Sequence, residues 1–201
     1  MKSILLTAVI LLTVSSFAFA DTYSELPVAD TWVWVGSGPW GANPTLRTNI
    51  VPAVDQEIVI LFDLSSIPAG SIINSAVLSC YRYDGDPGSA LECDIYRVTE
   101  YWEEPALVDS IAHDECVSYD QVVVSVNDWY DFDIAVLAQD WVDGTFTNFG
   151  VVFYGTGGTG SYQYFRSKES GMNEPHLDID YTPPSSLESV TFASIKASFS
   201  H

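Results

Sequence analysis

EIVILFDLSSIPAGSIINSAVLSCYRY, residues 57–83, contains two apolar runs separated by a short break. The runs, Glu57–Asp63 and Ile72–Tyr83, are rich in β-branched and aromatic residues, which favour the pleated and partly buried surface of a sheet. The break between them carries Pro68 and Gly70, which are typical of a turn. The segment therefore predicts two successive β-strands.

Similar short runs continue in both directions along the chain, each bounded by Gly, Pro, Asn or Asp. Turn signals are clearest at Asp84–Gly88 and at Gly155–Gly160. Many short strands at this spacing indicate an all-β fold, an antiparallel β-sandwich of jelly-roll type. The further predicted strands are Thr31–Val35, Leu91–Val98, Gln121–Val126, Trp129–Asp133, Phe149–Tyr154, Tyr162–Lys168 and His176–Tyr181.

One short helix is predicted after Asp133, whose carboxylate can cap its first turn. Ile134, Leu137 and Trp141 would share one face, which indicates a helix packed on the core. Gly144 follows at the point where a left-handed residue commonly ends a helix. A helix of about two turns depends on this packing for its stability.

The charge of the chain is strongly negative, with 27 acidic residues against 7 basic residues and a net charge of −20. Hydrophobic residues make up 47% of the 201 residues, which is enough to build a core and excludes a disordered acidic tail. A nucleic-acid partner is excluded because binding phosphates needs clustered Lys and Arg. An anionic membrane surface is disfavoured for the same reason.

The two ends differ from the rest of the chain. Residues 1–20 resemble a secretory signal peptide, with Lys2 before an apolar stretch and Ala18-Phe19-Ala20 as a cleavage pattern. Residues 21–182 would form the β-sandwich domain. A Pro-Pro-Ser-Ser linker then leads into a tail, so residues 183–201 are predicted to be a linker and a sorting or attachment segment. After signal cleavage no integral membrane span is expected.

Three cysteines, Cys80, Cys93 and Cys116, gain significance in a secreted protein. On period-two spacing, Cys80 and Cys93 both point towards the core. They could form a disulfide, which would contribute roughly 3 kcal/mol, or remain two buried thiols. Cys116 would then be free or available for pairing between molecules.

Motifs for catalysis are scarce. There is no Gly-x-Ser-x-Gly elbow for a nucleophile, and with this many acids a pair of nearby carboxylates does not distinguish a glycosidase. The glycine-rich stretch 155–160 precedes a predicted strand rather than a helix, so it is interpreted as a hairpin turn and not a dinucleotide site. Calcium is the metal that acidic turns suit, and Asp84 and Asp86 are the candidate ligands.

Aromatic residues suggest a binding surface. Trp32 and Trp34 share one face of a strand, while Val33 and Val35 share the other, and only one of the two faces need be buried. If the valines form the core, Trp32 and Trp34 would point outward beside Trp40, and exposed rings stack on sugars at small entropic cost. The alternative is that the tryptophans form the core, since large aromatic residues are mostly buried.

A second candidate surface lies on the strand predicted at 162–168. Alternate residues there combine aromatic rings with positive charges, and these side chains would all project from one face of the strand. The set is Tyr162, Tyr164, Arg166 and Lys168.

Nearly the whole of residues 22–181 resembles the DNRLRE domain family, also classed as carbohydrate-binding module family 96. The most specific match is Leu61-Phe62-Asp63-Leu64-Ser65-Ser66-Ile67-Pro68-Ala69-Gly70. Shorter matches occur at Asp30-Thr31, Trp40-Gly41, Ile95-Tyr96-Arg97-Val98, Trp102-x-Glu104, Phe132-Asp133-Ile134, Trp141-Val142-x-Gly144, Asn148-Phe149-Gly150, Phe165-x-Ser167-x-Glu169, Pro175-x-Leu177 and Tyr181.

The resemblance implies a secreted, non-catalytic β-sandwich at the cell surface or outside the cell that binds a polysaccharide, in some members an acidic one such as alginate. Residues 105–117 depart from the family pattern as an acidic, Cys-containing loop. The negative charge also opposes a polyanion unless Arg82, Arg97, Arg166 and Lys168 cluster, so a neutral glycan or calcium-bridged contacts are favoured. The alternatives are a structural surface protein that self-associates and an unrecognised hydrolase.

Overall fold

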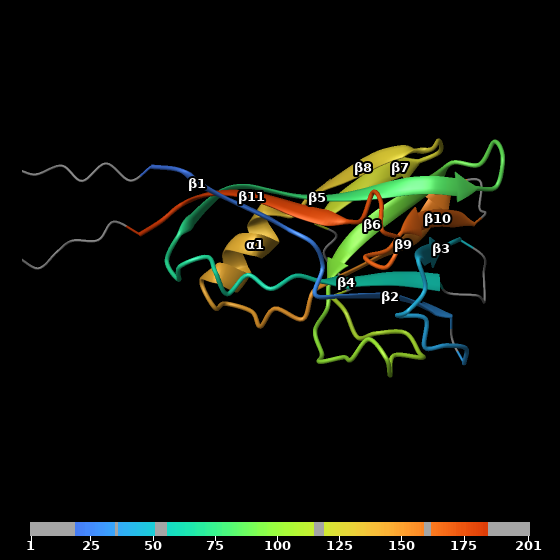
Figure 1. The fold of residues 1–201 in the computed structure, drawn as a ribbon, viewed down its shortest axis with the longest axis horizontal. Coiled ribbons are helices and arrows are strands. Elements are labelled where there is room, and N and C mark those ends of the chain that lie inside the picture. The colour runs from blue at the N-terminus through green and yellow to red at the C-terminus, as the bar shows by residue number, and fades with distance from the viewer. Residues whose placement is uncertain (1–18, 35, 51–55, 115–118, 159–161, 185–201) are drawn as a thin grey trace, which may run out of the picture.

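The computed structural model describes residues 19–34, 36–50, 56–114, 119–158 and 162–184 (Figure 1). Their strands form two sheets, and all of the strand pairs are antiparallel. The β5 sheet contains β1 (Asp21–Glu25), β11 (His176–Thr182), β5 (Ile72–Gly85), β10 (Gln163–Arg166), β3 (Thr45–Thr48) and β8 (Asp128–Asp133). The β4 sheet contains β2 (Ala29–Trp34), β4 (Gln56–Leu61), β9 (Val151–Gly158), β6 (Leu91–Arg97) and β7 (Asp120–Val124).

The two sheets pack face to face, which confirms the predicted antiparallel β-sandwich, whereas its jelly-roll type stays a prediction. Figure 1 shows β1, β11 and α1 at the end where both chain termini leave, and β3 and β10 at the opposite end. Each of the nine predicted strands overlaps a strand of the structure. β1 and β3 are not among the predicted strands.

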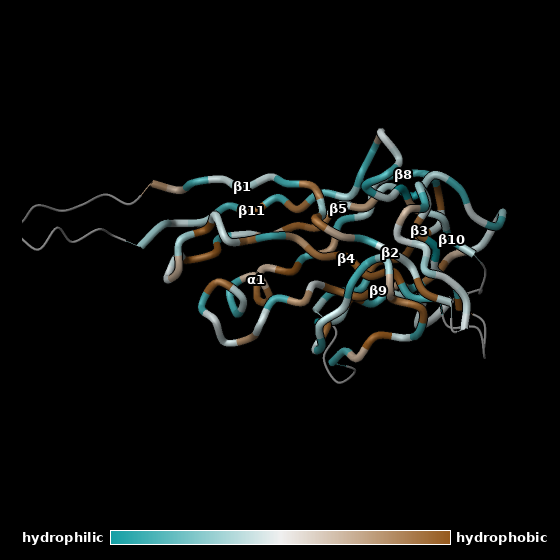
Figure 2. Tube along the Cα trace, turned by 60° about the horizontal axis from the view of Figure 1, so that its bottom comes forward, coloured by the Kyte–Doolittle hydropathy of each residue, from teal (hydrophilic) through white to brown (hydrophobic). Residues whose placement is uncertain are grey.

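The main core lies between the sheets and is built around three phenylalanines. Phe153 of β9 lies 5.1 Å from Phe132 of β8 and 5.5 Å from Phe165 of β10, measured between ring centroids. All three side chains are fully buried, so they join the β4 sheet to the β5 sheet. Figure 2 shows that β1 is largely hydrophilic, in keeping with its single buried residue, Tyr23.

A smaller core covers the other face of the β4 sheet. Val59 and Val152 point outward from β4 and β9, and Trp102 and Ile111 from the segment after β6 pack over them. The backbone amide of Ile111 also donates to Glu57 Oε2 at 3.3 Å. Both faces of the sheet are therefore buried around β4 and the start of β9, which the alternation of residues alone did not predict.

The single helix of the described residues, α1 (Ala135–Val142), is confirmed. The predicted face is buried, with Ile134, Leu137 and Trp141 between 0% and 9% exposed. Gly144 has the expected positive φ of 72°. The N-cap is Ile134 rather than Asp133, but the Asp133 carboxylate still accepts a hydrogen bond from the amide of the first helical residue, Ala135, at 3.0 Å. No helix in the described part of the chain is long and apolar enough to cross a membrane.

The glycine-rich stretch differs from the predicted hairpin turn, because β9 runs on through Gly158. A side chain at Gly155 or Gly158 would collide with Leu91 or with the carbonyl of Ala90 beside β6. These glycines therefore let the two strands approach closely. The last two residues of the stretch, Thr159 and Gly160, lie outside the described residues.

Cys80 and Cys93 point into the core from opposite sheets, as predicted, but both are free cysteines in the structure. The disulfide considered for this pair is therefore wrong, and the alternative of two buried thiols holds. Burial raises the pKa of both thiols well above the ordinary value. Cys116 lies outside the described residues, as do residues 1–18 and 185–201.

We expect a reducing agent to leave the melting temperature of the protein unchanged, because no Cys80–Cys93 bond exists to be broken. In a Cys116→Ser variant, a thiol reagent should label neither remaining cysteine until the protein unfolds, since thiolates react and these thiols are buried and protonated. Mass spectrometry before and after denaturation measures the labelling. A fall in melting temperature on reduction of that variant would contradict the prediction.

Candidate functional site

A group of tyrosines and arginines covers the outer face of the β5 sheet at the end away from the chain termini. On β10, Gln163 and Phe165 are buried, while Tyr164 and Arg166 point outward. On β3, Leu46 is buried and Arg47 points outward directly opposite Tyr164. We call this surface the Tyr–Arg face, and it consists of Arg47, Tyr83, Tyr162, Tyr164 and Arg166.

The members of the Tyr–Arg face stack on one another. The Arg47 guanidinium carbon lies 3.9 Å from the Tyr162 ring centroid and 5.4 Å from that of Tyr164. The Arg166 guanidinium carbon lies 4.0 Å from the Tyr83 ring centroid, and the Tyr83 and Tyr164 centroids are 6.4 Å apart. Cation–π stacking of this kind holds long arginine side chains in defined positions.

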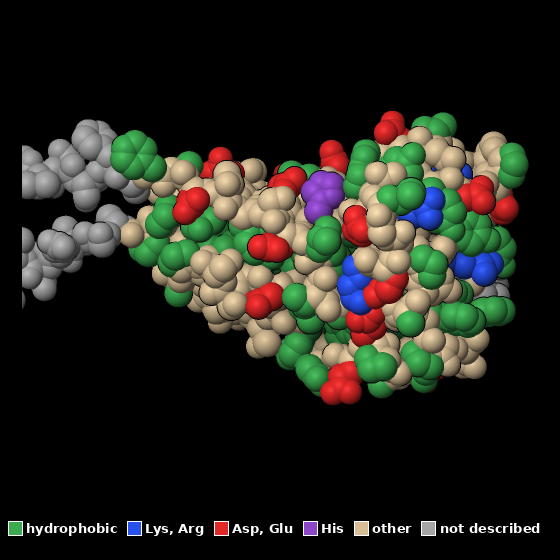
Figure 3. All heavy atoms as spheres, in the orientation of Figure 1, with side chains coloured by type: hydrophobic (Ala, Val, Ile, Leu, Met, Phe, Trp, Pro, Cys, Tyr) green, Lys and Arg blue, Asp and Glu red, His purple; other side chains and the backbone are tan. Residues whose placement is uncertain are grey.

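Neither arginine of the Tyr–Arg face has a carboxylate partner among the described residues. In a chain with 27 acidic residues this is unusual, and it contrasts with Arg97, which pairs with Asp114 at 3.3 Å. Figure 3 shows the visible Lys and Arg side chains gathered in the half of the molecule away from the chain termini. Arg47 and Arg166 are therefore able to receive anionic groups from a ligand.

Two of the basic residues considered in the sequence analysis lie elsewhere. Arg82 is buried and donates to the side-chain oxygens of Gln163 and Asn127. Lys168 forms ion pairs with Glu104, at 2.9 Å, and with Glu169. Its role as a ligand-binding residue stays a prediction, and its ammonium group already contacts two carboxylates.

The tryptophans of the predicted binding surface are only partly available. Trp32 is 5% exposed and packs in the core, so of the two alternatives the outward orientation is wrong for this residue and burial in the core holds. Its ring stacks on Trp40 with 4.9 Å between centroids. Trp40 is half-buried beside a shallow hollow that it forms with Pro39, Ala42, Asn43 and Pro44.

Trp34, at the end of β2, is 40% exposed. Val35 lies outside the described residues. Trp34 and Trp40 stay predictions as ligand contacts.

The row of outward-facing aromatic rings extends beyond the Tyr–Arg face along the β5 sheet. Tyr81 lies two residues before Tyr83 and contacts Trp129 of β8, with 5.3 Å between centroids. Trp129 is 37% exposed and contacts His176 of β11 at 4.9 Å. A long ligand bound across the sheet would therefore meet further aromatic surface.

Asp84 and Asp86, the predicted calcium ligands, are exposed around the end of β5. Asp84 Oδ1 accepts from the Gly85 amide at 2.8 Å, and Asp86 Oδ2 accepts from the Tyr162 amide at 3.3 Å. These hydrogen bonds shape the connection to the Tyr–Arg face. Among the described residues, the group of three acidic side chains that comes together is a different one, Asp30, Glu104 and Glu169.

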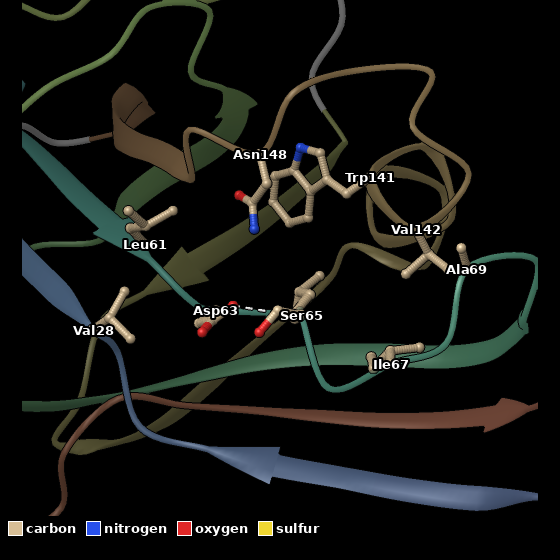
Figure 4. Close-up of a pocket in the computed structure, with 10 residues that line it drawn as sticks. Val28, Leu61, Asp63, Ser65, Ile67, Ala69, Trp141, Val142 and Asn148 are labelled. Atoms are coloured by element: carbon tan, nitrogen blue, oxygen red, sulfur yellow. Dashed lines mark hydrogen bonds between the residues drawn. The ribbon is translucent and has the colours of Figure 1, made fainter.

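A groove of about 600 Å³ between α1 and the turn after β4 is another concave site (Figure 4). Its polar groups already hold the turn: Asn148 donates to the Phe62 carbonyl at 2.9 Å, and Asp63 accepts from the Ser65 amide at 2.9 Å. The hydrogen bonds from Ser65 also lower the pKa of Asp63. Trp141 lines the groove but is only 9% exposed. The groove therefore offers fewer free groups to a ligand than the Tyr–Arg face does.

Comparison with protein families supplies the identity of the domain. No curated protein matches the chain. The family model described as carbohydrate-binding module family 96 matches residues 21–181, most of the chain, which includes every strand from β1 to β10. Such a family implies a non-catalytic binding module with a glycan as its partner. The chain thus belongs to carbohydrate-binding module family 96.

Proposed function

We propose that the protein binds an acidic polysaccharide across the Tyr–Arg face. The observation that carries the proposal is the pair of tyrosine-stacked arginines, Arg47 and Arg166, that lack carboxylate partners in the described residues. Guanidinium groups bind carboxylate and sulfate groups through two parallel hydrogen bonds. Tyrosine rings supply apolar surface for the faces of the sugars.

The negative charge of the whole chain favours a neutral glycan, but the local arrangement outweighs it for a ligand held in contact. Charges separated by more than about 10 Å are largely screened at 0.1 M salt, whereas a direct guanidinium–carboxylate contact is not. The distant acids should therefore slow the encounter at low salt more than they weaken the bound state. For this reason we favour an acidic glycan over a neutral one.

The location of the protein is inferred from the sequence at its two ends. A signal peptide at residues 1–20 would place the domain outside the cell, at the cell surface or released, where polysaccharides are found. The alternative role, a self-associating structural protein, depends on Cys116 and the tail at 183–201. Cys116 and residues 185–201 lie outside the described residues, so no contact supports that role over glycan binding.

We expect Arg47→Ala and Arg166→Ala each to weaken binding to a polyuronate at least tenfold, since a charge-assisted hydrogen bond contributes about 1.5 kcal/mol or more. Isothermal titration calorimetry with the polyuronate and with a neutral glucan of similar length measures the change. Arg97→Ala is the matched control, because Arg97 lies on β6 of the other sheet and pairs with Asp114.

The control should leave the affinity unchanged. Arg47→Lys should lie between wild type and alanine, since lysine keeps the charge but loses the planar fork. Equal affinity of the wild type for the neutral glucan and the polyuronate, together with no effect of Arg47→Ala, would overturn the proposal.

A further inference from the structure

Three acidic side chains from distant parts of the chain meet beside the end of β10. Asp30 comes from β2, Glu104 from the segment after β6, and Glu169 from the turn after β10. One carboxylate oxygen from each lies within 4.8 Å of the others. Carboxylates this close disfavour each other's charged forms unless cations lie among them.

Asp30 is the member of this cluster that points to a missing partner. Its residue is 0% exposed, and its Oδ1 atom has no hydrogen-bond partner among the described residues. Only Oδ2 is occupied, by the Lys168 amide at 2.7 Å. A buried carboxylate oxygen that has lost its hydration and has no partner is energetically unfavourable. Such an atom indicates that a ligand atom or an ion binds there.

Lys168 does not balance the cluster. Its single ammonium group contacts two carboxylates, Glu104 and Glu169, and leaves the Oδ1 atom of Asp30 without a partner in the described residues. A divalent cation would supply the charge that is lacking.

We propose that Asp30, Glu104 and Glu169 form a calcium site. The donor set consists of oxygens alone, which suits a hard cation rather than zinc or copper. Two calcium–oxygen bonds of about 2.3–2.6 Å span the distance within which these oxygens lie. Magnesium demands a tighter octahedron and keeps more of its own water, so three converging carboxylates favour calcium.

The position of the site indicates what calcium would do. It would join β2 of the β4 sheet to the segment after β6 and to the turn that follows β10 of the β5 sheet. A Cβ at Gly41 would collide with the Glu104 side chain, so the Gly41 backbone lies directly against that side chain. Calcium would therefore stabilise the edge where the two sheets meet, without contacting the glycan.

The test uses the purified protein stripped of metal with chelator. Titration calorimetry with calcium chloride should give saturable binding at one site, and calcium should raise the melting temperature relative to chelator. Magnesium chloride at the same concentration should bind at least tenfold more weakly. Asp30→Asn and Glu104→Gln should each reduce calcium affinity at least tenfold and abolish the shift in melting temperature.

The matched controls are Glu103→Gln and Asp84→Asn. Glu103 is the exposed neighbour of Glu104, and Asp84 belongs to the acidic turn at the end of β5, so both variants should keep wild-type calcium affinity.

Lys168→Met should raise the affinity at least tenfold, because it removes the competing ammonium group. Wild-type protein that neither binds calcium nor gains melting temperature would overturn the proposal, as would loss of binding in Asp84→Asn alone. Glycan binding is measured separately, so either proposal can fail without the other.

Discussion

Replacing Phe153 by alanine should destabilise the protein by about 3–5 kcal/mol, the cost of removing a fully buried phenylalanine. The ring lies between Phe132 and Phe165, and all three are completely buried. Its loss would leave a cavity at the contact between the two sheets. The surrounding strands cannot close this cavity, because their backbone hydrogen bonds fix the spacing of each sheet.

Chemical denaturation followed by tryptophan fluorescence measures this change in the free energy of unfolding. Phe153→Leu keeps most of the volume and should cost clearly less than alanine. Val126→Ala serves as the surface control, since Val126 is 59% exposed and should change stability by less than about 0.5 kcal/mol. A cost for Phe153→Ala no larger than that of the surface control would contradict a sandwich joined at this point.

The strands that sequence patterns predicted are those with several apolar residues of their own. β4 and β5 are long and rich in β-branched residues, so local preference and tertiary packing agree. β1 has one buried residue in five, and β3 is four residues long. Both form because a neighbouring strand offers unpaired backbone groups, and a partner from a distant part of the chain leaves no local signal.

Trp32 shows a second limit of sequence patterns. Alternation separates the two faces of β2 correctly, since Trp32 and Val33 do point to opposite sides. It assumes, however, that one face meets solvent. Here Trp32 packs in the core between the sheets, and Val33 on the opposite face is buried as well. The segment carrying Trp102 and Ile111 covers part of that outer face. The choice between core and surface depended on a covering loop that strand periodicity does not describe.

Some residues of the candidate site could likewise be predicted from the sequence, and others could not. The outward direction of Tyr164 and Arg166 follows from period-two spacing on β10. Arg47 and Tyr83 could not be assigned from the sequence, because they join the surface through strand pairing. The acidic cluster was missed for the same reason, since its three members come from three separate segments.

Tyr164→Ala should cause the largest loss of glycan affinity of any single substitution on the Tyr–Arg face, about thirtyfold or more. Tyr164 lies between Arg47, Tyr83 and Tyr162, so its ring supports its neighbours and, on the proposed binding surface, would also contact the ligand. Central aromatic residues of binding surfaces commonly contribute about 2 kcal/mol or more, which corresponds to that change in affinity.

Three variants separate this prediction from the alternatives. Tyr164→Phe keeps the ring and should retain most of the affinity, whereas Trp34→Ala removes an exposed ring that lies on β2 of the other sheet. Calorimetry with the polyuronate measures affinity, and the melting temperature shows that each variant is folded. If Tyr164→Ala binds normally while Trp34→Ala or Trp40→Ala does not, the binding surface lies at the β2 edge. Loss in Tyr164→Ala with retention in Trp34→Ala instead places the ligand on the β5 sheet, where aromatic surface continues through Tyr81 to Trp129.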